Sequence, residues 1–142
     1  MKYIKIYENY KDKIKSKIQF NDFITEYPSG FYMIYKSGSY NWKFNKQNNY
    51  LALCRILSPK IFDECIQLNV DIISYICELD QHELKENEKI HIGREIINTY
   101  PSSFEKIFIS SSLKVSQDKF EELKETTYYQ WELNNATNKF NL

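Results

Sequence analysis

Glycine is scarce in this chain of 142 residues, and its scarcity excludes the common phosphate-binding loops. The three glycines are Gly30, Gly38 and Gly93. None of them belongs to a G-x-G or G-K-[ST] sequence, whose glycines let the backbone approach a phosphate group closely. Nucleotide binding through such a loop is therefore not expected.

Cysteine and histidine are also few, and they form no recognisable reactive or metal-binding pattern. Cys54, Cys65 and Cys77 stand far apart among apolar residues, which favours reduced, buried thiols over a disulfide framework. No C-x-x-C or H-x-x-x-H pair, the usual signature of a structural zinc site, is present. One local cluster holds possible ligands, namely His82, Glu83, Glu86, Glu88 and His91. Lysines are interspersed with them, so a solvated charge run is the better interpretation, and we expect no metal or cofactor.

Long apolar runs and a net charge are absent as well. No stretch approaches the roughly 18 apolar residues that cross a bilayer, and residues 1–10 lack the apolar core of a signal peptide. Basic and acidic residues both number 19, so no overall field draws the protein to nucleic acid or to a membrane. The charges divide unevenly, with +5 on residues 1–50 and −5 on the rest. We expect a soluble, cytoplasmic protein that contacts no membrane.

What the sequence does contain indicates one folded domain. Hydrophobic residues make up 42% and charged residues 27%, as in globular proteins, and the length suffices for a self-contained core. Lys, Ile, Asn and Tyr are enriched, which is the bias of an A/T-rich genome and would fit a phage or mobile-element product. We expect a single α+β domain over residues 1–142 with a loose tail from about residue 134.

Strands are predicted in the N-terminal part. Residues 2–7 have strand composition, and residues 8–20 fit a short helix better than a strand. A turn sequence at 27–30 leads into a hairpin at 31–45, in which Ser37-Gly38-Ser39 supplies the loop. Residues 50–57 add a more buried strand. The sequence therefore predicts a small antiparallel sheet of three to four strands.

Helices are predicted after residue 57. Ser58-Pro59 resembles a helix start, and apolar residues then recur at helical spacing to Leu79, with a break near Asn69 as an alternative. Residues 90–97 fit a short strand or a further helix, and residues 102–108 another helix. Ser116 is the expected N-cap of the last helix, whose buried face is Phe120, Leu123, Thr127, Tyr128 and Trp131. The predicted fold is α+β, with the sheet packed against three to four C-terminal helices.

One surface combines aromatic and basic residues, and it lies on the predicted hairpin. Its candidate partner-binding residues are Tyr32, Lys36, Tyr40, Trp42, Lys43 and Lys46. Tyr and Trp anchor many protein interfaces, and lysines attract acidic groups. By alternation, however, Tyr40, Trp42 and Phe44 are also the apolar face of the sheet, so these aromatics are either core or interface.

Three hypotheses about function follow from these patterns. The leading one is a non-enzymatic protein-binding module, such as a small inhibitor, adaptor or immunity-type protein, that uses the hairpin surface against an acidic partner. The alternative is binding of single-stranded RNA or DNA by the same surface, with rings stacking on bases and lysines near phosphates. The scarcity of Arg, with two residues against 17 Lys, disfavours specific base recognition. The third is a hydrolase or nuclease that uses carboxylates scattered in the sequence, which would need a buried acidic pair beside a pocket.

Overall fold

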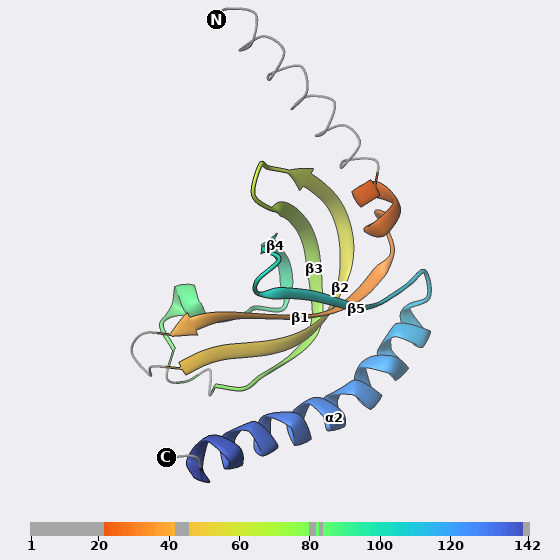
Figure 1. Ribbon diagram of the computed structural model, residues 1–142. Coiled ribbons are helices and arrows are strands. Elements are labelled where there is room, and N and C mark those ends of the chain that lie inside the picture. The colour runs from red at the N-terminus through yellow and green to blue at the C-terminus, as the bar shows by residue number, and fades with distance from the viewer. Residues whose placement is uncertain (1–21, 42–45, 80–81, 83, 141–142) are drawn as a thin grey trace, which may run out of the picture.

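A computed structural model of the protein describes residues 22–41, 46–79, 82 and 84–140 (Figure 1). Within these residues it consists of five strands, a one-turn helix at 22–26, a short 3-10 turn and one long C-terminal helix. In chain order the labelled elements are β1 (Tyr32–Asn41), β2 (Lys46–Ile61), β3 (Ile66–Cys77), η2 (Glu86–Glu88), β4 (Gly93–Thr99), β5 (Phe104–Ser110) and α2 (Leu113–Phe140).

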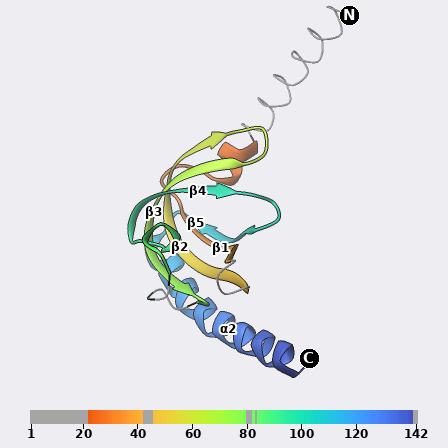
Figure 2. The same cartoon turned by 90° about the vertical axis from the view of Figure 1, so that its left-hand side faces the viewer.

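The five strands form one antiparallel sheet in the order β4-β3-β2-β1-β5. The two edge strands, β4 and β5, follow each other in the chain and are joined by the turn at residues 100–103. Since so short a connection links opposite edges, the sheet has to curl until those edges approach each other (Figures 1 and 2). The curl gives the sheet an inner, concave face and an outer face.

Irregularities in strand pairing accompany the curl. The register of β2 against β3 shifts between Leu53 and Cys54 and again between Ile56 and Ser58. The register of β1 against β5 shifts between Ile34 and Tyr35. An extra residue on one strand of a pair bends that strand and increases its twist. These shifts therefore let long strands wrap around the inner face.

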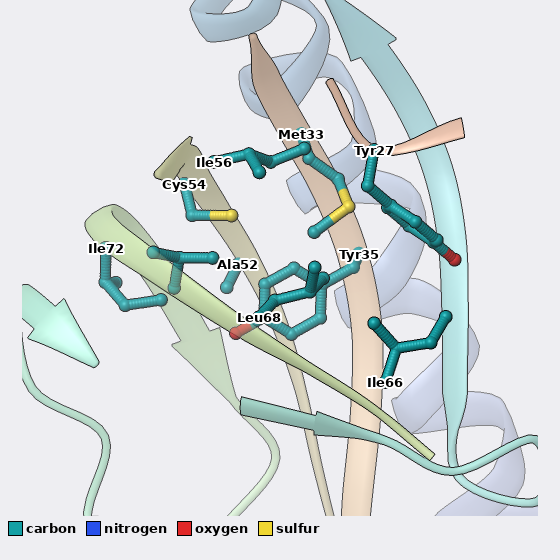
Figure 3. Close-up of a cluster of buried hydrophobic side chains, with 10 residues drawn as sticks. Tyr27, Met33, Tyr35, Ala52, Cys54, Ile56, Ile66, Leu68 and Ile72 are labelled. Carbon is teal, nitrogen blue, oxygen red and sulfur yellow. The ribbon is translucent and has the colours of Figure 1, made fainter. Parts of the chain in front are cut away.

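The inner face is filled by side chains from all five strands. Alternate residues of each strand point to it, as the period of a strand requires. The cluster contains Tyr27, Met33, Tyr35, Ala52, Cys54, Ile56, Ile66, Leu68, Val70 and Ile72, with Ile97, Phe104 and Ile109 packed against it. Figure 3 shows most of these side chains pointing toward one another. Tyr27, just before β1, closes one end, and the ammonium group of Lys106 lies 5.0 Å from its ring centroid.

The outer face is covered by α2, which lies along β1, β2 and β5 in both views (Figures 1 and 2). Its buried residues recur at the three- and four-residue spacing of an amphipathic helix. They are Ser116, Phe120, Thr127 and Trp131, with Leu123 half-buried. Against them pack Ile34, Leu51, Leu53 and Ile76 from the sheet. The sheet is thus apolar on both faces, one closed by its own curvature and one by α2.

The helix begins four residues earlier than the sequence predicts. The hydroxyl of Ser112 accepts a hydrogen bond from the backbone N–H of Val115 at 3.3 Å, which is the geometry of an N-cap. Ser116, the predicted cap, instead lies inside the helix and donates to the carbonyl of Ser112 at 2.8 Å. The helix runs on through Phe140, into the stretch for which the sequence favoured a loose tail.

The prediction of three to four C-terminal helices is wrong, because most of that region forms strands. Residues 58–61 complete β2, residues 66–77 form β3, residues 93–99 form β4, and residues 104–110 form β5. Pro59 is tolerated in β2 because β1 pairs with β2 only as far as Arg55, so the proline lies where β2 has a neighbour on one side alone. Two features of the predicted α+β fold are present, namely the antiparallel sheet and the long C-terminal helix.

The predicted hairpin is longer than expected. Ser37, Gly38 and Ser39 continue β1 instead of forming the loop, and Gly38 pairs with Asn49 in β2. The strand expected at 50–57 is confirmed as part of β2, and it pairs directly with β1. The predicted elements at 2–7 and 8–20 lie outside the described residues. No described helix is both long and apolar enough to cross a membrane.

Candidate functional site

The six predicted partner-binding residues are only partly described. Tyr32 is half-buried and packs against the cluster beneath α2, so much of its ring belongs to the core. Lys36 is half-buried and points toward a groove. Tyr40 and Lys46 lie at the distal ends of β1 and β2, but their side chains are not described. Trp42 and Lys43 lie outside the described residues, as does Phe44. Lys36 is therefore the member of the predicted surface whose surroundings can be analysed.

The groove beside Lys36 lies where the β1–β2 hairpin, the start of β5 and α2 meet. Its volume is about 490 Å³, and its walls include Lys36, Asn49, Tyr50, Ser102, Glu105 and Trp131. Lys36 on β1 and Glu105 on β5 are direct cross-strand partners, so the groove offers both signs of charge. Trp131 is buried, and its indole forms part of the wall.

Next to the groove, α2 exposes a set of large side chains. Tyr128, Tyr129 and Leu133 flank Trp131 on the helix and are exposed by 45%, 62% and 43%. The rings of Tyr128 and Trp131 meet edge to face at 5.8 Å. All residues from 132 to 137 are exposed, so this part of α2 extends past the sheet. We call Lys36, the groove, Tyr128, Tyr129 and Leu133 together the helix–groove surface.

A second cavity, of about 460 Å³, opens on the inner face between β1 and β4; we call it the inner cavity. Its lining includes Tyr35, Tyr50, Lys89, Glu95, Ile97 and Tyr100. Ser37, Gly38, Tyr50 and Ser103 line both this cavity and the groove, so these residues separate the two spaces. The backbone N–H of Gly38 donates to the carbonyl of Ser103 at 3.2 Å, which ties β1 to the 100–103 turn at that wall.

Burial perturbs the acidity of the tyrosines around the inner cavity. Burial, and secondarily the neighbouring Tyr50, raises the pKa of Tyr35 well above its usual value. Burial also raises the pKa of Tyr50, while interactions with Tyr35 and Ser37 oppose that rise. Both phenols are therefore hydrogen-bond donors at neutral pH rather than charged groups.

The thiols of Cys54 and Cys77 are poorly suited to nucleophilic catalysis. All three cysteines are free; Cys54 is buried, and Cys65 and Cys77 are half-buried. Burial raises the pKa of Cys54 to about 12 and that of Cys77 to about 11. A reactive cysteine instead needs a lowered pKa, because the thiolate is the nucleophile.

The acidic and histidine residues form no buried assembly among the described residues. Glu86 pairs with His91 at 3.3 Å and with Lys89 at 3.7 Å on the surface. No group of three possible ligands gathers in the described part of the chain, although Glu83 and the side chain of Glu88 lie outside it. No described Asp or Glu is buried, so these residues do not supply the acidic pair that the hydrolase hypothesis requires.

Several residues of both spaces escaped sequence reasoning. The sequence pattern predicts Trp131 in the core of the last helix, Tyr35 among the aromatic residues of the hairpin surface, Tyr50 in a strand without a role, and Glu95 in a stretch of ambiguous structure. Tyr35 and Glu95 stand 60 positions apart in the printed sequence, and no local pattern connects them. They line the same cavity because β4 folds back toward β1 when the sheet curls.

Comparison of the chain with protein-family models, with curated proteins and with solved structures found no match. Function therefore has to be argued from the geometry of the described residues.

Proposed function

We propose that this protein is a non-enzymatic protein-binding module that contacts an acidic partner through the helix–groove surface. The observation that carries the proposal is the exposed set Tyr128, Tyr129 and Leu133 beside a groove walled by Trp131 and Lys36. Tyrosines give large contact areas at low cost in side-chain entropy, and a concave site beside them can accept a side chain of the partner.

Charge supports an acidic partner over a basic one. Lys36 on β1 borders the groove, and residues 1–50 carry nine basic and four acidic groups, a net charge of +5 within a neutral chain. Glu105, the cross-strand neighbour of Lys36 on β5, is then available to a donor of the partner. The partner would place a carboxylate against Lys36 and apolar groups against the tyrosines.

Capture from host lysate followed by reconstitution with the identified partner tests the proposal. The purified pair should form a stoichiometric complex that survives nuclease, and Tyr129→Ala should weaken it roughly tenfold or more, as expected for an anchor residue. Lys36→Glu should slow association and reduce the salt dependence. Val115→Ala and Lys114→Ala are matched controls, because both residues are exposed at the distant start of α2.

Two results would count against this function. Loss of all captured material after nuclease treatment would favour the single-stranded nucleic acid hypothesis, in which affinity falls steeply with salt. A stoichiometric complex that tolerates both Tyr129→Ala and Lys36→Glu would place the interface elsewhere on the molecule.

A further inference from the structure

The inner cavity is lined by two polar groups, the buried hydroxyl of Tyr35 on β1 and the carboxylate of Glu95 on β4, which no described cation pairs. Its volume of about 460 Å³ suits a small organic molecule. It lies on the concave face between β1 and β4, whereas the helix–groove surface lies on the other side of the wall formed by Gly38 and Ser103. It is therefore a separate space that the proposed function does not use.

The first of these groups is the hydroxyl of Tyr35. Tyr35 is 1% exposed and lines the cavity. Its ring is fixed by stacking on Phe104 at 5.1 Å and by an edge contact with Tyr50 at 5.7 Å. The Tyr50 hydroxyl interacts with its oxygen, but no described residue forms a hydrogen bond of normal distance and angle with it. A buried hydroxyl whose hydrogen bonding is incomplete is costly, and such groups often mark places where a ligand supplies the missing bond.

The second group is the carboxylate of Glu95. It belongs to β4 and, like Ile97, is half-buried and lines the cavity, whereas its neighbour Arg94 is exposed and does not line it. It lies near enough to Tyr35 to contribute to the raised pKa of that phenol. No described cation pairs with Glu95; Lys89, which also lines the cavity, is paired with Glu86 at 3.7 Å.

Aromatic rings stand beside this carboxylate. Tyr35, Tyr50 and Tyr100 all line the cavity. Aromatic faces attract organic cations through their quadrupole, and a carboxylate adds charge attraction and a hydrogen-bond acceptor. An ammonium group satisfies this combination, and a hydroxyl on the same molecule can accept from Tyr35.

We propose that the inner cavity is a binding site for a small hydroxylated organic cation, with Glu95 as its counter-ion and the Tyr35 hydroxyl as a hydrogen-bond donor. The neighbouring tyrosine rings form the walls around the cationic group. An inward carboxylate on an edge strand can also prevent edge-to-edge association without any ligand. The experiment has to separate these two roles.

Choline is a suitable probe, because 3,3-dimethylbutan-1-ol is its neutral isostere. Both are titrated into the full chain at neutral pH and constant ionic strength, and backbone amide shifts are followed by NMR. Choline should give saturable shifts at the strands around Tyr35 and Glu95, and the isostere should bind roughly tenfold or more weakly, as expected for loss of the cationic interactions.

Variants assign the two groups. Glu95→Gln should weaken choline binding roughly tenfold without changing binding of the isostere, and Tyr35→Phe should weaken choline several-fold. Glu125→Gln is the matched control, because Glu125 is an exposed carboxylate of α2 that lines neither the cavity nor the groove. Urea unfolding confirms that each variant is folded.

Three outcomes overturn the proposal. They are the absence of saturable binding at millimolar choline, equal binding of choline and its isostere, and a Glu95→Gln variant that binds choline as tightly as the parent. The first outcome would leave edge protection as the role of Glu95. None of them bears on the protein partner, whose complex is measured through Tyr129 and Lys36.

Discussion

Replacing Tyr35 by Phe should stabilise this protein, although the change removes a polar group from its core. The substitution deletes the hydroxyl and keeps the ring, whose contacts with Phe104 at 5.1 Å and Tyr50 at 5.7 Å remain. Removing a hydroxyl that forms a buried hydrogen bond usually costs about 1 kcal/mol of stability. The Tyr35 hydroxyl interacts with the Tyr50 hydroxyl but forms no hydrogen bond of normal distance and angle with the described residues, so the expected sign is reversed.

The magnitude follows from the environment of the oxygen. Burying a hydroxyl without a partner costs about 1–3 kcal/mol. The oxygen borders a cavity that can admit solvent, which relieves part of that cost. We therefore expect the free energy of unfolding to rise by about 1 kcal/mol, which for a domain of this size corresponds to about 3 °C in Tm.

Urea unfolding at neutral pH measures this change, with an unchanged m-value as evidence that only stability has altered. Tyr50→Phe is the matched control, because the Tyr50 hydroxyl interacts with both Tyr35 and Ser37 and its removal should lower stability. A Tyr35→Phe variant that is less stable than the parent by about 1 kcal/mol or more would show that the hydroxyl is hydrogen-bonded in solution, and the reasoning would fail. The same variant should bind choline more weakly, so stability and binding would move in opposite directions.

Three further predictions concern α2 and the buried thiol. Phe120→Ala should lower the free energy of unfolding by about 3–5 kcal/mol, because this side chain is buried against the sheet. Tyr129→Ala should lower it by less than about 0.5 kcal/mol, because this side chain is exposed. Equal losses of stability in urea unfolding would contradict the packing of α2. Ser112→Ala should lower the free energy of unfolding by about 1 kcal/mol, because it removes the N-cap hydrogen bond. Ser111→Ala, at the exposed neighbouring residue, should leave the free energy of unfolding almost unchanged. Burial raises the pKa of Cys54 to about 12 from an ordinary 9.0. The contribution of the protonated thiol to the free energy of unfolding is therefore complete below pH 9 and is lost as pH rises toward 12. By pH 10 the free energy of unfolding should have fallen by about 1 kcal/mol, and Cys54→Ala should flatten this decline between pH 8 and 10. If the variant shows the same slope of stability against pH as the parent, the thiol ionises freely in the folded protein.

The last helix was predictable because its apolar spacing is clear in the sequence and agrees with its packing. Phe120, Leu123, Thr127 and Trp131 are buried or half-buried as the periodicity predicts, whereas Tyr128 is exposed. The cap was misplaced because Ser112 and Ser116 both precede apolar residues, and only the backbone geometry distinguishes them. Local sequence thus determined the type of this element better than its first residue.

The strands after residue 57 were missed although β3 alternates regularly. Ile66, Leu68, Val70 and Ile72 are buried, and the residues between them are polar. The Ser58-Pro59 sequence resembles a helix start, and it therefore favours a helix where this alternation favours a strand. It does not act as one, because the extension of β2 beyond β1 leaves room for a proline. Long-range pairing therefore overrode the local preference for a helix.

The curl of the sheet connects the two proposed sites. Joining β4 to β5 through residues 100–103 brings opposite edges of the sheet together, and the same turn supplies walls to both the groove and the inner cavity. The hydrogen bond from Gly38 to Ser103 holds this turn against β1. A cation that orders Tyr35 and Tyr50 on the inner side would also order the wall of the groove, because Tyr50 lines both spaces. Binding of the small cation and of the protein partner would then be thermodynamically linked, each changing the affinity for the other by the same factor.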